Sequence, residues 1–130
     1  MTEPTDAPSR SPQGDPRDPP VVVALVPDLM DRSRLARRPI EFVNAAALLP
    51  IVAAGARLVV VDLSRPGVVD VLDALVESAA RVVGFAPHVE DEVLALAVGH
   101  GVEAMPRSVF FRRIDELLDE VLGGATGGDA

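Results

Sequence analysis

The chain has 130 residues, a formal net charge of −8, 48% hydrophobic residues and no cysteine. This length predicts one domain with a single core of ordinary size. The negative charge disfavours binding to nucleic acid, and the lack of cysteine excludes disulfides and cysteine-based zinc sites.

No stretch of the sequence predicts a membrane span or a secretory signal. The longest apolar run without a charge, 42–56, contains an asparagine, a proline and a glycine and falls short of the roughly 20 residues of a span. The N-terminus has acids where a signal peptide would have a basic and then an apolar region. We therefore expect a soluble, cytoplasmic protein that does not bind membranes.

The two ends of the chain resemble tails. Residues 1–20 hold half of the twelve prolines and almost nothing that could be buried, so we expect this segment to be disordered. Residues 123–130 are rich in glycine and predict a second flexible tail. The folded domain is expected over 21–122.

The domain opens with a strand, a helix and a second strand. The apolar run 21–26 predicts a central strand, and the shorter, more polar 40–43 predicts an edge strand. Between them a helix is expected over 29–38, ended by Pro39. Its sheet-facing residues would be Leu29, Met30 and Leu35, and its water-facing residues Arg32, Arg34, Arg37 and Arg38.

A second helix is expected over 45–54. Asn44 is a suitable N-cap and Gly55 a suitable stop. Pro50 conflicts with a continuous helix because its ring clashes with the carbonyl four residues earlier, so we expect a kink or a helix that starts near Pro50.

The second half of the domain repeats the same alternation. Apolar runs at 58–61, 81–85 and 102–105 predict three strands, and each precedes a helical pattern. Acidic residues open the helix that ends at Gly99, and Ser108 is a suitable cap for the last helix. The expected buried positions of the first and last of these helices are Val68, Val71, Leu72, Leu75, Val76 and Ala79, and Phe110, Phe111, Ile114, Leu117, Leu118 and Val121.

Five strands that alternate with five helices predict a (βα)5 doubly wound parallel sheet. The flavodoxin-like strand order 2-1-3-4-5 is the common one for this number of elements, and its switch point lies between the first and third strands. Loops after the strands would then gather polar residues at the carboxyl edge of the sheet. These residues are Asp28, Asp31, Asn44, Asp62, Ser64, His88 and Arg107, together with Ala86.

The segment RLVVVDLSRPG, an apolar strand closed by Asp62 with Pro66 four residues later, resembles the phospho-acceptor strand of response-regulator receiver domains. The resemblance covers essentially all of 21–122. It implies that Asp62 accepts a phosphoryl group with Mg²⁺ as the one cofactor, held by Asp28 and Asp62. It also implies a histidine kinase or another signalling protein as partner, a role in two-component phosphorelay, and a homodimer through the last helix.

The sequence departs from the receiver pattern at several positions. Pro27 stands where the first of two adjacent acids should be, and Asp31 could replace that acid only if the first helical turn points back toward the site. Ala86 occupies the position of a Ser or Thr hydroxyl that would bond the phosphoryl group, followed by Pro87 and His88. Arg107 stands in place of the lysine. We therefore expect an atypical or pseudo-receiver that acts through protein contacts, with a phosphorylatable regulator as the alternative.

Structural roles remain open for each of these residues. Asp62 could satisfy backbone N–H groups of its own loop, Asp28 could cap the first helix, and His88 could be an exposed loop residue. Arg107 could be solvated or paired with an aspartate. No Walker loop, nucleophile elbow or H-E-x-x-H motif is present, so no enzymatic activity is expected. A binder of small ligands in the flavodoxin-like crevice is a third class of function.

Overall fold

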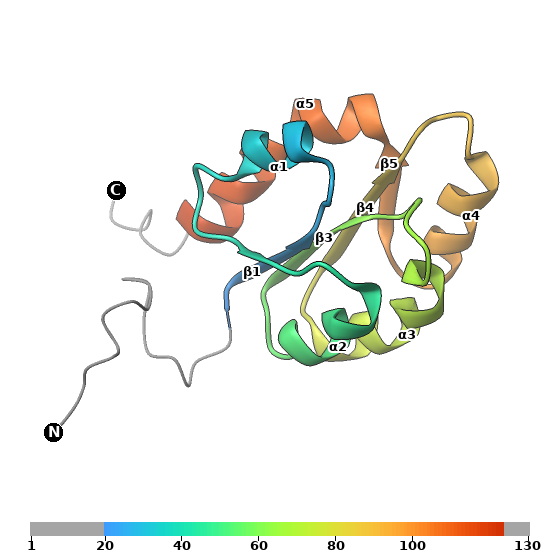
Figure 1. Cartoon of the computed structure of the whole chain (residues 1–130), viewed down its shortest axis with the longest axis horizontal. Helices are drawn as coiled ribbons and strands as arrows, with labels where there is room; N and C mark the ends of the chain where they lie inside the picture. Colours follow the sequence, from blue (N-terminus) through green and yellow to red (C-terminus); the bar gives the residue numbers. More distant parts are fainter. Residues whose placement is uncertain (1–19, 124–130) are drawn as a thin grey trace, which may run out of the picture.

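The computed structural model describes residues 20–123 of the chain (Figure 1). The two expected tails lie almost wholly outside these residues, so their disorder stays a prediction. No helix within 20–123 is both long and apolar enough to cross a membrane.

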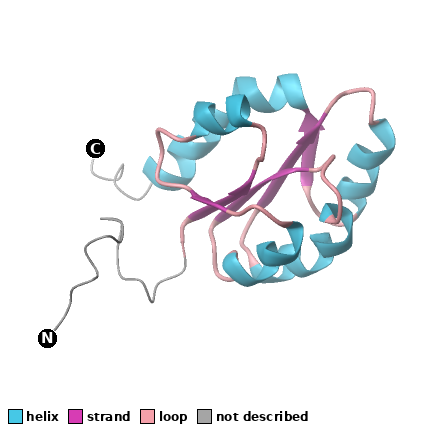
Figure 2. Ribbon diagram, in the orientation of Figure 1, coloured by secondary structure: helices cyan, strands magenta, loops and turns pink. Residues whose placement is uncertain are grey.

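The domain is built on one parallel sheet of five strands (Figure 2). Its strand order is β2-β1-β3-β4-β5, which confirms the expected flavodoxin-like (βα)5 fold. The strands are β1 (Val22–Leu25), β2 (Glu41–Phe42), β3 (Leu58–Asp62), β4 (Val82–Ala86) and β5 (Glu103–Pro106). All residues of β1, β3 and β4 are buried, whereas β2 is a two-residue edge strand, as its polar sequence predicts.

Helices cover both faces of the sheet (Figure 1). They are α1 (Leu29–Leu35), α2 (Leu49–Val52), α3 (Val68–Ser78), α4 (Asp91–Gly99) and α5 (Arg107–Leu118), with a 3-10 turn (Ala46–Leu48) before α2 and a π-helical turn (Asp119–Gly123) after α5. Helices α1 and α5 pack on one face, and α2, α3 and α4 pack on the other.

The core is divided by the sheet because successive strand residues point to opposite faces. Val59 and Val61 of β3 join the cluster under α2, α3 and α4, whereas Leu58 and Val60 join the cluster under α1 and α5. Both groups are fully buried, so β3 is covered on both faces. This arrangement explains the unbroken apolar run that ends at Asp62.

Helix α1 differs from the expected helix in length and in orientation. It ends at Leu35 rather than at Arg38, and Arg38 precedes a proline, which disfavours the helical conformation at that residue. Its buried residues are Asp31 and Leu35, one turn apart, whereas Leu29 and Met30 are 77% and 75% exposed. The expectation that Leu29 and Met30 face the sheet was therefore wrong.

Two of the expected helix caps were also wrong. Ala45 is the N-cap of the 3-10 turn and makes no side-chain cap, while Asn44 accepts a hydrogen bond from Arg32. At α5 the strand β5 continues to Pro106 and the helix follows at once from Arg107, so Ser108 already lies inside the helix. The expected effect of Pro50 is confirmed, since α2 begins with Pro50 in its first turn.

Candidate functional site at the carboxyl edge of the sheet

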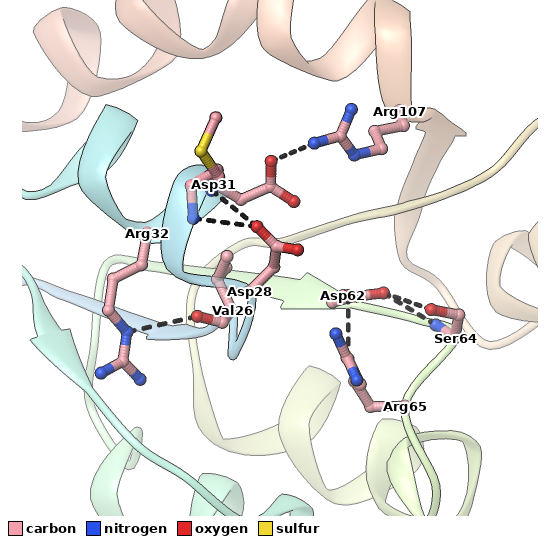
Figure 3. Close-up of polar contacts among 9 residues, drawn as sticks. Val26, Asp28, Asp31, Arg32, Asp62, Ser64, Arg65 and Arg107 are labelled. Atoms are coloured by element: carbon pink, nitrogen blue, oxygen red, sulfur yellow. Dashed lines mark hydrogen bonds and ion pairs between the residues drawn. The ribbon is translucent and has the colours of Figure 1, made fainter.

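The strand pairing brings most of the expected site residues to one edge. Leu25 of β1 pairs with Val61 of β3, so the loop that carries Asp28 follows next to the tip of β3 that carries Asp62. On the other side, Ala86 pairs with Pro106, and Arg107 comes next in the chain. Figure 3 shows Asp28 between Asp31 and Asp62, with Arg107 reaching toward them from the start of α5.

Asp62 uses both of its carboxylate oxygens within its own loop. Its Oδ1 accepts hydrogen bonds from the backbone N–H of Ser64 at 3.1 Å and from the Ser64 hydroxyl at 2.6 Å. Its Oδ2 accepts one from Arg65 Nε at 3.1 Å (Figure 3). Asp62 is only 6% exposed, so its carboxylate has lost most of its contact with water, and the bonds from Ser64 and Arg65 compensate for that loss.

Asp28 caps helix α1. Its Oδ1 accepts hydrogen bonds from the backbone N–H groups of Met30 at 2.9 Å and Asp31 at 3.1 Å. These N–H groups belong to the first turn of α1, which has no partners within the helix for them. The structural role that the sequence left open for Asp28 is therefore confirmed.

Arg107 pairs with Asp31 rather than with Asp62. Its Nη2 donates to Asp31 Oδ1, and Asp31 is 3% exposed (Figure 3). The guanidinium also lies over the ring of Phe111, with Cζ 5.0 Å from the ring centroid. The first turn of α1 thus directs the Asp31 carboxylate to α5. Of the two structural roles that the sequence left open for Arg107, the pairing with an aspartate is confirmed.

Ala86 and His88 contribute no polar contact to this site. Ala86 is fully buried at the end of β4, where its methyl group packs in the core cluster under α2, α3 and α4. His88 is exposed in the loop after β4 and makes no hydrogen bond or ion pair with residues 20–123. The hydroxyl of the receiver pattern has no substitute at Ala86.

The sequence interpretation missed two arginines at this edge. Arg65 holds Asp62, and Arg32 donates from Nε to the carbonyl of Val26 at 3.3 Å and from Nη2 to Asn44 Oδ1 at 3.0 Å. Arg65 could have been found, because Asp62 and Ser64 have the spacing of an Asx-turn that folds the chain back on the carboxylate. Nothing local in the sequence indicates the Arg32 contacts, and its expected water-facing role was only partly right.

The described residues hold no group of three or more acidic, histidine or cysteine side chains arranged to bind a metal. Asp28 and Asp62 are the two residues that could supply oxygens to Mg²⁺, which demands six ligands in near-octahedral geometry. An ion bound to both carboxylates would compete with Arg65 for Asp62 and with the backbone N–H groups of α1 for Asp28. Mg²⁺ binding therefore stays a prediction.

The opposite edge of the sheet has two shallow, open hollows. Their volumes are about 600 and 540 Å³, and they share Arg81 and Glu120 in their linings. Arg81 Nε and Nη2 donate to Glu103 at 2.6 and 2.9 Å. This hydrogen-bonded pair lowers the pKa of Glu103 and raises that of Arg81. None of the expected site residues lines either hollow.

Comparisons of the chain with protein-family models, with curated proteins and with solved structures found no significant match.

Proposed function

We propose that this chain is an atypical receiver-like signalling module that acts through protein contacts, with a degenerate phosphorylation site at Asp62. The flavodoxin-like fold and an acid at the tip of its central strand support this proposal. A histidine kinase or another signalling protein is the class of partner that the receiver resemblance implies.

The observation that carries the proposal is the internal neutralisation of the site. Asp62 is held by Arg65 and Ser64, and the cation that could meet a phosphoryl group, Arg107, is held by the buried Asp31. A phosphoryl group on Asp62 would have to displace contacts within the protein and would find no hydroxyl at Ala86. The phosphoryl group would then interact almost equally well with both conformations of the protein, so it would shift the equilibrium between them only a little.

The competing function is a phosphorylatable regulator that uses Mg²⁺. It is favoured by the position of Asp28, since the loop after β1 brings a second carboxylate beside Asp62 (Figure 3). Separation of Asp62 from Arg65 would free oxygens for a metal ion at this edge.

Beryllofluoride, a mimic of the phosphoryl group, distinguishes the two functions. We expect isothermal titration calorimetry with beryllofluoride and Mg²⁺ to give no saturable heat, and Asp62→Asn to behave as the unmodified chain does. Tight binding that Asp62→Asn abolishes would overturn the degenerate site in favour of the phosphorylatable regulator. Circular dichroism of Asp62→Asn checks that the variant is folded.

The last helix offers a charged outer surface for partners. Its apolar stripe, Phe110, Ile114, Leu117 and Leu118, is buried against the sheet, and its exposed residues include Arg112, Asp115 and Glu116. A homodimer through this helix would therefore have to be polar. The most exposed apolar side chains lie elsewhere on the molecule.

A further inference from the structure

Two arginines from different helices lie on one aromatic ring at the surface. Arg34 of α1 and Arg107 of α5 have their Cζ atoms 4.2 and 5.0 Å from the ring centroid of Phe111. This ring packs in turn on Phe85 and Phe110, with ring centroids 5.4 and 4.8 Å from its own, so the core holds it in place. The two guanidinium groups are therefore partly ordered before any partner binds.

Exposed neighbours extend this cluster along both helices. Met30, which is 75% exposed, lies one turn before Arg34 on α1. On α5, Ser108 lies one turn before Phe111 and Arg112, and both Ser108 and Arg112 are exposed. The contact between Arg34 and Phe111 joins the two helices, which cover the same face of the sheet (Figure 1), so these side chains form one continuous surface. We call it the α1–α5 surface, and its residues are Met30, Arg34, Arg107, Ser108, Phe111 and Arg112.

The α1–α5 surface carries positive charge and has no exposed acid of its own. The one acid of α1, Asp31, is 3% exposed and already paired, and residues 107–114 contain no acid. The next acid along α5, Asp115, is bonded to Arg38 at 3.4 Å. Asp28 caps the start of α1 and lies beside the tip of β3, outside this surface (Figure 3).

The residue types of this surface are those that protein interfaces favour. Aromatic residues, Met and Arg are enriched at interfaces, whereas Asp and Glu are depleted there. None of the ion pairs among residues 20–123 involves Arg34 or Arg112. An arginine that is already held on a ring loses less side-chain freedom on binding than a free one.

We propose that the α1–α5 surface binds an acidic segment of a partner protein. Carboxylates of the segment pair with Arg34 and Arg112, and an apolar side chain packs on Met30 and the ring of Phe111. The proposal rests on the proposed function only in that the chain acts through protein contacts. The state of Asp62 does not enter it.

A short acidic segment fits this surface better than an extended polyanion does. The net charge of −8 repels a nucleic acid or an anionic membrane, because both present charge far beyond the α1–α5 surface. A short segment meets mainly the local positive charge, and salt screens its repulsion from the rest of the chain over about 8 Å at physiological ionic strength.

Selection from a random peptide library displayed on phage, with the full chain as bait, tests the chemistry of the partner. We expect the enriched peptides to combine several acids with an apolar residue. Enrichment of neutral or basic peptides overturns the proposal, as does the absence of any enrichment. Co-sedimentation with phosphatidylserine vesicles runs in parallel, and vesicle binding that Arg34→Glu abolishes would indicate a lipid surface and overturn the proposal.

Charge reversal locates the bound peptide. Arg34→Glu and Arg112→Glu should each weaken the binding of an enriched peptide by about tenfold or more in fluorescence polarisation, because attraction becomes repulsion. Arg113→Glu is the matched control. It changes the net charge equally and lies on α5, but Arg113 lines a hollow at the opposite edge of the sheet, so the affinity should be unchanged.

Equal losses in all three variants would reveal a general effect of net charge and overturn the proposal. Unchanged binding in Arg34→Glu and Arg112→Glu would place the peptide elsewhere and also overturn it. Circular dichroism checks that each variant is folded.

The peptide test and the beryllofluoride test can fail separately. Asp62→Asn should bind the peptide as the unmodified chain does. Peptide binding at the α1–α5 surface together with tight beryllofluoride binding overturns the degenerate site alone. The absence of both overturns the acidic partner alone.

Discussion

At the residue scale, the contact between Asp62 and Arg65 decides whether the buried acid is tolerated. We expect Arg65→Ala to lower the free energy of unfolding by about 1 to 2 kcal/mol, because it leaves a buried carboxylate with only the Ser64 contacts. The 41% exposure of the Arg65 side chain keeps this value below that of a fully buried pair. Urea unfolding measures the difference.

Arg112→Ala is the control for that measurement. Arg112 is an exposed arginine that makes no ion pair with residues 20–123, so we expect a change within about 0.5 kcal/mol. Equal losses in the two variants would show that the Arg65 contact does not stabilise the fold.

The sequence made the position of Asp62 predictable but not the state of its carboxylate. An apolar run closed by an acid indicates the tip of a buried parallel strand, and the strand order follows from the number and alternation of elements. The partner of Arg107 is Asp31, 76 positions earlier in the chain, and no local pattern specifies such a pair. It depends on how α1 and α5 pack on the same face.

At the element scale, the Asp31–Arg107 pair links α1 to the start of α5. We expect Arg107→Ala to cost about 2 kcal/mol, since it leaves Asp31 buried without its cation. Asp31→Asn in the same chain should recover part of that loss, because a neutral amide is cheaper to bury than a carboxylate. A double-mutant cycle by denaturant unfolding measures the coupling, and simple additivity of the two changes would contradict it.

A second ion pair ties the start of β4 to β5 and should make stability depend on pH. The Arg81 hydrogen bonds lower the pKa of Glu103 in the folded chain. Because the pKa of Glu103 is lower in the folded than in the unfolded chain, the ion pair stabilises the fold at pH values above the unfolded-state pKa of about 4.3. This stabilisation is lost as the pH falls through the folded-state pKa.

We therefore expect the unmodified chain to exceed Glu103→Gln in stability by about 0.5 kcal/mol at pH 7, a small value because the pair is partly exposed. The difference should shrink as the pH falls below about 4.3 and should be lost once the pH has passed through the lowered folded pKa of Glu103. Thermal unfolding across this range measures it. In a chain that already carries Arg81→Gln, adding Glu103→Gln should change the stability by the same amount at every pH. A stability difference that still depends on pH would show that another acid causes the effect.

Helix boundaries and caps were the least predictable elements. The alternation of strands and helices gave every element its place, but Leu29 and Met30 were assigned to the wrong side of α1. Local spacing alone left the phase of this short helix open, whereas the Asp28 cap and the Asp31 and Leu35 contacts determine it. Asn44 and Ser108 have side chains suited to capping a helix, yet the helical segments near them begin at other residues.

At the scale of the whole molecule, the sheet has one core cluster on each of its two faces. Leu72 of α3 is fully buried in one cluster and Phe110 of α5 in the other. Phe110 also stacks on Phe85 of β4 with ring centroids 4.5 Å apart. Loss of either side chain leaves a cavity on one face only.

We expect Leu72→Ala to cost about 2 to 5 kcal/mol and Phe110→Ala about 3 to 5 kcal/mol, each a large part of the stability of a domain of this size. Because the sheet belongs to both clusters, each variant should still unfold in a single transition. Milder changes, Leu72→Val and Phe110→Leu, keep the double variant folded, and their costs should add to within about 0.5 kcal/mol. Circular dichroism and hydrogen exchange measure both properties, and two separate transitions would show that the faces fold as independent units.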